Sequence, residues 1–109
     1  MVYSEFSLSK AIKYRRTNLT MFFYTYALVC KGGNSRSFYI GYCRDIEERI
    51  QQHMRGEVFA TKKFDSIELV YYEACISKTD AIKRELQLKT GFGRGYIKKR
   101  LESYLTSRD

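Results

Sequence analysis

The sequence predicts an α+β domain in which a three-stranded antiparallel β-sheet is flanked by helices, in the element order ββαβαα. Three segments rich in aromatic and β-branched residues have the composition of strands. A short glycine-rich loop separates the first two segments, which is typical of an antiparallel hairpin. Helical periodicity appears only after the second segment, so the helices are available to cover the sheet.

The hairpin is expected from residue 22 to residue 43. The apolar run at 22–30 is typical of a well-buried strand, and a second strand is expected at 37–43. Between them, Gly32, Gly33, Asn34 and Ser35 form a turn, because glycine and asparagine tolerate positive φ.

A first helix is expected to follow the hairpin. Asp45 predicts its N-cap, and the helix should extend to about residue 55, where Gly56 ends it. Ile46, Ile50 and Met54 recur at i, i+4 and i+8, which predicts the stripe that faces the core.

The rest of the chain alternates once more between strand and helix. A loop at 57–65 leads to a third strand at 67–76, and Ser77 with Asp80 predicts a capping box for a helix at 78–89. Glycines at 91, 93 and 95 predict a helix–helix turn, followed by a third helix at about 96–106. This Gly-rich stretch lacks the preceding strand and the following Lys-Ser/Thr of a phosphate-binding loop.

Composition points to a small globular protein with an anionic partner. The 109 residues fit one domain, and a hydrophobic share of 44% with 16% aromatics argues against a disordered chain. Lys and Arg total 20 against 12 Asp and Glu, a formal charge of +8. Such an excess favours nucleic acid, with a membrane surface or a role in solubility as alternatives.

Cysteine use and hydropathy favour the cytoplasm. The three cysteines, Cys30, Cys43 and Cys75, show no CxxC spacing, so we expect reduced packing residues rather than a disulfide or zinc framework. No apolar run approaches the ~20 residues of a membrane span, and residues 1–20 lack the apolar stretch of an export signal. We divide the chain into a basic extension at 1–20 and a domain at 21–109, and expect the extension to be peripheral, with Met21 as a possible second start of translation.

Glu85 has an unusual position on the predicted second helix. At 100° per residue, Ala81, Ile82, Leu86 and Leu88 form an apolar arc with Glu85 in its middle, whereas Lys83, Arg84 and Gln87 face solvent. A buried carboxylate needs a cation. Two alternatives follow: an internal ion pair, or a metal ligand, since a single hard carboxylate suits Mg²⁺.

Arg49 and His53 form a second unusual pair. Their i, i+4 spacing places them on one helix face, beside the Ile46 and Ile50 stripe. They are candidates to neutralise Glu85 or to bind a phosphate, and His53 has the alternative of a purely structural role. Further basic residues, candidates for binding nucleic acid, lie in the 57–65 loop and near the C-terminus: Lys62, Lys63, Arg94, Lys98, Lys99 and Arg100.

The tripeptide Tyr39-Ile40-Gly41, followed by Arg49 and His53, resembles the second half of the GIY-YIG nuclease signature. The first half is matched by Tyr24-Thr25-Tyr26, where Tyr24 stands in place of the usual glycine. The runs 81–85 and 88–94 are similar to the small stand-alone members of that family. The resemblance extends from Phe22 to about Leu105, roughly four-fifths of the chain.

This resemblance implies a metal-dependent DNA endonuclease that uses one divalent ion, Mg²⁺ or Mn²⁺, and hydrolyses duplex or branched DNA. It implies Glu85 as the metal ligand, Arg49 as the contact to the scissile phosphate, and Tyr26, Tyr39 and His53 as further catalytic residues. With Tyr26 as general base, its pKa must fall from about 10 towards 7. A nucleic-acid-binding module without activity and an RNA-acting or ribosome-associated protein remain alternatives, and oligomeric state, protein partners and substrate preference stay open.

Overall fold

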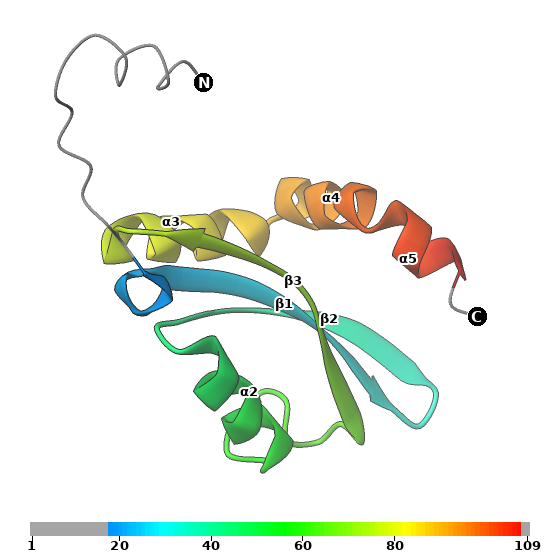
Figure 1. Cartoon of the computed structure of the whole chain (residues 1–109). Coiled ribbons are helices and arrows are strands. Elements are labelled where there is room, and N and C mark those ends of the chain that lie inside the picture. Colours follow the sequence, from blue (N-terminus) through cyan, green and yellow to red (C-terminus); the bar gives the residue numbers. More distant parts are fainter. Residues whose placement is uncertain (1–17, 108–109) are drawn as a thin grey trace, which may run out of the picture.

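The computed structural model of the protein describes residues 18–107. Within them the elements are the 3-10 turn η1 (Leu19–Met21), β1 (Phe23–Gly32), β2 (Ser35–Cys43), α2 (Ile46–Met54), β3 (Ser66–Cys75), α3 (Lys78–Leu88), α4 (Gly91–Arg100) and α5 (Glu102–Ser107). The antiparallel sheet and the ββαβ order that begins it confirm the predicted α+β fold (Figure 1). Residues 1–17 lie outside this description, so the division at residue 20 stays a prediction.

β1 is the central strand of the sheet. The strand order is β2-β1-β3, with both neighbours antiparallel to β1 (Figure 1). Tyr26, near the middle of β1, pairs with Gly41 on β2 and with Tyr72 on β3. Its central position explains why all residues from 24 to 30 are buried and why this run has the most apolar sequence in the chain.

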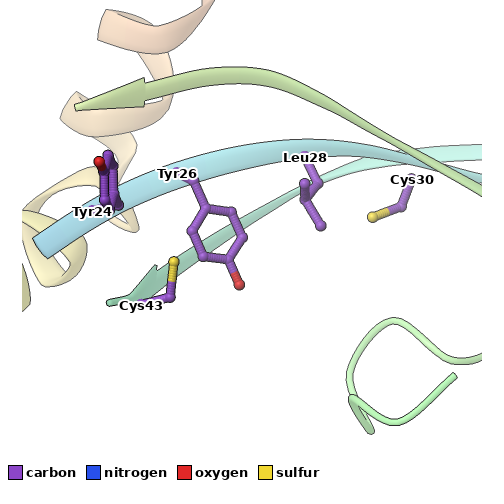
Figure 2. Packing of buried hydrophobic residues seen from close by; sticks show 5 residues of the cluster. All are labelled: Tyr24, Tyr26, Leu28, Cys30 and Cys43. Carbon is purple, nitrogen blue, oxygen red and sulfur yellow. The ribbon is translucent and has the colours of Figure 1, made fainter. Parts of the chain in front are cut away.

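The two faces of the sheet are covered by different helices. α2 lies on one face and α3 on the other, with α4 and α5 continuing beyond α3 (Figure 1). Because side chains alternate along a strand, β1 supplies one set of residues to each face. On the α2 face the buried cluster is Tyr24, Tyr26, Leu28, Cys30 and Cys43 (Figure 2). On the α3 face it is Ala27, Ile40, Leu88 and Ile97.

The predicted N-caps at Asp45 and Ser77 and the predicted hairpin turn are confirmed. The Asp45 side chain accepts a hydrogen bond from the Glu48 amide at the start of α2, and the Ser77 side chain accepts one from Asp80 at the start of α3. Gly33 has φ +57° in the hairpin turn, a conformation that favours glycine. The predicted α2 stripe is only partly right: Met54, at the last turn, is 65% exposed.

The predicted break at the three glycines was wrong. The break after α3 lies earlier, at residues 89–90, so α4 begins at Gly91 and contains all three glycines; a second interruption falls at Leu101, between α4 and α5. Thr90 caps α4 by accepting from the Gly93 amide. Gly93 is buried, and a Cβ there would overlap the backbone of Leu88 and the Gln87 carbonyl. Glycine at 93 therefore serves the close approach of α4 to the end of α3, not a turn.

Arg84 was predicted to face solvent, but its side chain is partly buried against Glu73. Its guanidinium makes a two-pronged ion pair with Glu73 on β3, with Nε and Nη2 each 2.8 Å from a carboxylate oxygen. Tyr71 donates to the same carboxylate at 2.7 Å, and Arg84 stacks over Tyr96 of α4. This network joins β3, α3 and α4, because the planar guanidinium bonds a carboxylate and stacks on a ring at once.

Cys30 and Cys43 are buried, Cys75 is partly buried, and all three are free thiols, which confirms that they form no disulfide framework. Between residues 18 and 107, no helix has the length and apolar character needed to cross a membrane.

Candidate active site

The hydroxyl of Tyr26 is the centre of a polar cluster on the α2 face of the sheet. Tyr26 is fully buried, yet its oxygen lies 2.8 Å from Nε2 of His53 and accepts a hydrogen bond from Nε of Arg49 at 3.3 Å. Arg49 and His53 come from one face of α2, as their spacing predicted. The structure therefore brings three of the predicted site residues into direct contact.

Gly41 makes room for that hydroxyl. It lies opposite Tyr26 on β2, and a Cβ at this position would overlap the phenol oxygen and ring of Tyr26. Any side chain would therefore push the phenol away from Arg49 and His53. Glycine is therefore needed at the third position of the Tyr-Ile-Gly tripeptide, because a side chain there would occupy the space of the Tyr26 phenol.

A second hydrogen bond orients the His53 ring. Its Nδ1 lies 2.7 Å from Oγ1 of Thr61, and the Thr61 hydroxyl donates to the Val58 carbonyl at 3.5 Å. Arg49 has only donors, so the Tyr26 hydroxyl accepts from it and directs its own proton to Nε2, which assigns the ring proton to Nδ1, donating to Thr61. Nε2 is then the unprotonated nitrogen, and it accepts the proton of the Tyr26 hydroxyl.

The electrostatics keep this cluster uncharged apart from Arg49. Burial, with a smaller contribution from Arg49, lowers the pKa of His53 to about 4, so the imidazole is neutral at pH 7. Burial also raises the pKa of Tyr26, and it outweighs the hydrogen bond from Arg49, which lowers it. The lowering of the Tyr26 pKa was expected from a metal ion together with Arg49 and His53, and it stays a prediction.

Tyr39 lies at the more open side of the cluster. It is only partly buried, and its ring centroid lies 5.0 Å from that of His53 and 6.2 Å from that of Tyr26. Arg49 is held by a hydrogen bond from Nη1 to Oε1 of Gln52 at 2.8 Å. Tyr26 first and Tyr39 to a lesser extent raise the pKa of Arg49, so its positive charge is secure.

Glu85 is positioned from the opposite face of the sheet. The Thr25 hydroxyl donates to the Ala81 carbonyl at 2.9 Å and attaches α3 to β1, and Glu85 follows one turn later on the same side of the helix. The Glu85 side chain is 18% exposed, and Oε2 lies 3.0 Å from Nζ of Lys89. The partially buried carboxylate therefore has a cation, as expected from its position.

The partner of Glu85 differs from the predicted candidates. Within the described part of the chain, the Glu85 carboxylate forms its ion pair with Lys89 and not with Arg49 or His53. The predicted apolar arc was also too wide, since Leu86 is 61% exposed. The helix turns Ala81 and Leu88 inward and leaves Glu85 at the edge of that buried strip.

A small pocket lies beside the buried cluster of the α3 face. It has a volume of about 200 Å³ and lies between β2 and the junction of α3 with α4. Tyr39 lines it from the strand, and Lys89, the partner of Glu85, lines it from the end of α3 together with Arg94 of α4. The remaining lining residues are apolar: Phe38, Ile40 and Ile97.

The donor set fits a hard divalent ion bound through one protein ligand. Across residues 18–107 no group of three His, Cys, Asp or Glu side chains is arranged to hold a metal, so a cage made by the protein alone is absent there. Mg²⁺ commonly uses one or two carboxylates and completes its shell with water and phosphate oxygens. Glu85, a partly exposed carboxylate whose ion-pair partner Lys89 lines the pocket, meets that requirement.

The predicted nucleic-acid-binding residues are exposed but come from two places. Lys62 and Lys63 lie in the loop after α2, with their ammonium groups over the rings of Phe59 and Phe64 at 4.8 Å and 5.4 Å. Four belong to α4: Arg94, Lys98, Lys99 and Arg100. Only Arg94 among these lines the pocket beside Tyr39.

Three site residues were missed by sequence reasoning: Gln52, Thr61 and Lys89. Each is a common polar residue that acts by contact with a neighbour, so it leaves no periodicity or spacing signal of its own. Lys89 alone was detectable, because it lies four residues after Glu85, the spacing that brings side chains together on a helix.

The chain belongs to the GIY-YIG nuclease family: the model of the GIY-YIG catalytic domain matches residues 22–100. It is similar to a UPF0213 protein of Staphylococcus saprophyticus, 43% identical over 68 residues, which cover 62% of this chain and 79% of the relative. A UPF0213 protein of Staphylococcus aureus is 37% identical over the same shares of both chains. No solved structure matches.

Proposed function

We propose that this protein is a divalent-metal-dependent endonuclease that hydrolyses phosphodiester bonds of DNA, with Mg²⁺ or Mn²⁺ as cofactor. The observation that carries the proposal is the convergence of Arg49, His53 and Tyr39 around the Tyr26 hydroxyl, beside the pocket. Hydrolysis of a phosphodiester needs a proton acceptor for water and positive charge for the phosphoryl oxygens, and these groups are suited to both tasks.

Arg49 is the group best suited to the phosphate. Its guanidinium is held by Tyr26 and Gln52, which reduces the entropy lost when it binds a phosphoryl oxygen. Glu85 would hold the metal ion, which would supply charge neutralisation and stabilisation of the leaving oxygen. The protein itself supplies the fixed donors, and a fixed donor needs no reorganisation when charge develops.

We assign the proton acceptor to Tyr39 rather than to Tyr26. Tyr26 is fully buried, whereas Tyr39 is partly exposed beside His53, where a water can contact it. In this assignment Tyr26 is a positioning residue that joins Arg49 to neutral His53.

The DNA substrate is proposed to be held by backbone contacts. The basic residues of the 57–65 loop and α4 are exposed lysines and arginines, which suit phosphate contacts that do not distinguish sequence. We propose structure-selective or weakly sequence-selective cutting in the cytoplasm, in DNA repair, recombination or mobile-element processing.

The decisive experiment is nicking of supercoiled plasmid with Mg²⁺, Mn²⁺ or EDTA. The wild type should nick only with metal. Glu85→Gln should abolish nicking while the affinity for DNA stays the same or rises, because a negative charge near phosphate has been removed. Branched DNA and RNA in the same assay separate a structure-selective nuclease from an RNA-acting protein.

Two results contradict the proposal. A wild type that binds DNA but never nicks it supports the binding-module alternative. A Glu85→Gln protein that nicks as fast as the wild type removes Glu85 as metal ligand. Because the pair with Lys89 lies near the surface, this substitution should cost little stability, which a melting curve of both proteins checks.

A further inference from the structure

Lys89 faces two parts of the candidate site at once. Its ammonium lies 3.0 Å from Oε2 of Glu85, and the same side chain lines the pocket with Tyr39 and Arg94. Lys89 is the C-cap residue of α3 and precedes Thr90, the N-cap of α4, so it belongs to the junction of the two helices that forms one side of the pocket. The carboxylate and the pocket therefore share one cation.

We infer that Lys89 couples phosphate entry to metal binding: it neutralises Glu85 in the free protein and moves to a DNA phosphate in the pocket when DNA binds. The inference rests on the proposed function, because it takes Glu85 as the metal ligand. It adds to the proposed function one residue, Lys89, and one subsite that binds a ligand. The ligand is a backbone phosphodiester, and the cations of the subsite are Lys89 and Arg94.

The pocket suits a phosphate better than a larger ligand. At about 200 Å³ it is smaller than the pockets of roughly 300–1,000 Å³ that hold organic ligands. Two of its lining residues, Lys89 and Arg94, are cationic. The other walls are Phe38, Ile40 and Ile97, whose low polarity strengthens the attraction between the cations and an anion.

The pair with Glu85 is weak enough to be exchanged. The Lys89 side chain is 50% exposed, and the pair has the i, i+4 spacing of a helix surface. Such pairs shift an equilibrium constant by only about twofold. A phosphate in the pocket attracts the ammonium away from Glu85, and the carboxylate, only 18% exposed, then requires another cation. A divalent ion provides it.

The test uses Lys89→Met, which removes the charge and keeps a stem of similar length. Lys83→Met is the matched control, since Lys83 is an exposed lysine of the same helix that does not line the pocket. Mn²⁺ binding to each free protein is followed by the EPR signal of unbound Mn²⁺. Binding to a short fluorescent duplex is measured by anisotropy in EDTA, so no turnover occurs in either measurement.

The inference predicts two changes of opposite sign for Lys89→Met. Mn²⁺ should bind about two- to tenfold more tightly, because the competing cation is gone. DNA should bind about three- to tenfold more weakly, because a charged contact to phosphate is lost. Lys83→Met should leave Mn²⁺ binding unchanged. A purely structural ion pair predicts neither change at Lys89.

The outcomes separate the coupling from the proposed function. If Glu85→Gln weakens Mn²⁺ binding but Lys89→Met binds both ligands as the wild type does, the coupling is overturned and the metal site stands. Equal changes in Lys89→Met and Lys83→Met also overturn the coupling, because they reflect net charge only. If Glu85→Gln leaves Mn²⁺ binding intact, both the metal site and the coupling fail.

Discussion

The Tyr26 hydroxyl lies 2.8 Å from Nε2 of His53, and both side chains are buried. The contact joins the central strand β1 to α2, and the bond from His53 to Thr61 extends it to the loop that follows. Groups that are candidates for catalysis are therefore also part of the core. Their protonation affects the stability of the fold, and this link is measurable without any substrate.

The first prediction concerns pH and stability. The pKa of His53 is about 4 in the folded protein and about 6.5 when unfolded. Its contribution is fully present above pH 6.5 and is lost as the pH falls towards 4, since the unfolded chain takes up the proton first. Urea unfolding should show that the wild type loses about 1–2 kcal/mol more than His53→Gln between pH 7 and pH 5.

Measurements for this comparison stop at pH 5 so that the ordinary titration of carboxylates contributes little. The two proteins are compared by their change with pH, so the lower starting stability of His53→Gln does not enter. Identical pH dependence in both would mean that His53 is accessible to protons in the folded state.

The second prediction concerns two glycines of α4. A Cβ at Gly93 would overlap the backbone of α3, whereas a Cβ at Gly95 would meet no atom within 4 Å. Gly93→Ala should therefore destabilise the protein by about 1–3 kcal/mol. Gly95→Ala should stabilise it by about 0.5–1 kcal/mol, because alanine is the better helix former. Chemical denaturation measures both, and a stable Gly93→Ala protein would contradict the close approach of α4 to α3.

The same stretch shows where sequence reasoning succeeded and failed. The hairpin, the caps at Asp45 and Ser77 and the two-sided sheet were predictable, because each depends on local patterns of turn residues and apolar periodicity. The glycines at 91, 93 and 95 have the same local pattern as a turn. Only the approach of two helices, which is a tertiary contact, distinguishes a helical glycine from a breaker.

The candidate site was predictable to a similar degree. The positions of Arg49, His53 and Glu85 stood out because charged or polar residues recur beside apolar stripes. The partners of these residues did not, since a hydrogen bond from Thr61 or an ion pair with Lys89 depends on where a loop or helix end lies. The rise that burial causes in the Tyr26 pKa was not predicted, because the complete burial of this phenol depends on how α2 packs on the sheet.

The third prediction compares the two phenols. Tyr39→Phe should lower the single-turnover cleavage rate by ~10²–10⁴, the usual contribution of a general base. Tyr26→Phe should lower the rate less, but it should cost about 1–3 kcal/mol of stability because buried His53 loses its donor. Rapid-quench kinetics and urea unfolding measure the two effects. If Tyr26→Phe loses more activity than Tyr39→Phe while remaining as stable as the wild type, the base is Tyr26.

The last prediction concerns the salt dependence of DNA binding. Neutralising a phosphate releases condensed counterions, so log K should fall by roughly 0.9 per contact for each unit of log salt. Lys98 and Lys99 are exposed at the end of α4. Reversing both to Glu should weaken binding to all sequences alike and reduce the slope by about 1.8 if each makes one contact.

The control for this measurement reverses Lys78 and Lys83, two exposed lysines of α3, and so changes net charge by the same amount. Long-range attraction alone would make the two double variants equal, whereas a defined backbone contact at the end of α4 makes the slope fall only for Lys98 and Lys99. Titrations in EDTA between low and physiological salt, with anisotropy as readout, distinguish these cases. Equal slopes in the wild type and in the Lys98 and Lys99 variant would show that DNA is held elsewhere, with Lys62, Lys63 and Arg94 as the remaining candidates.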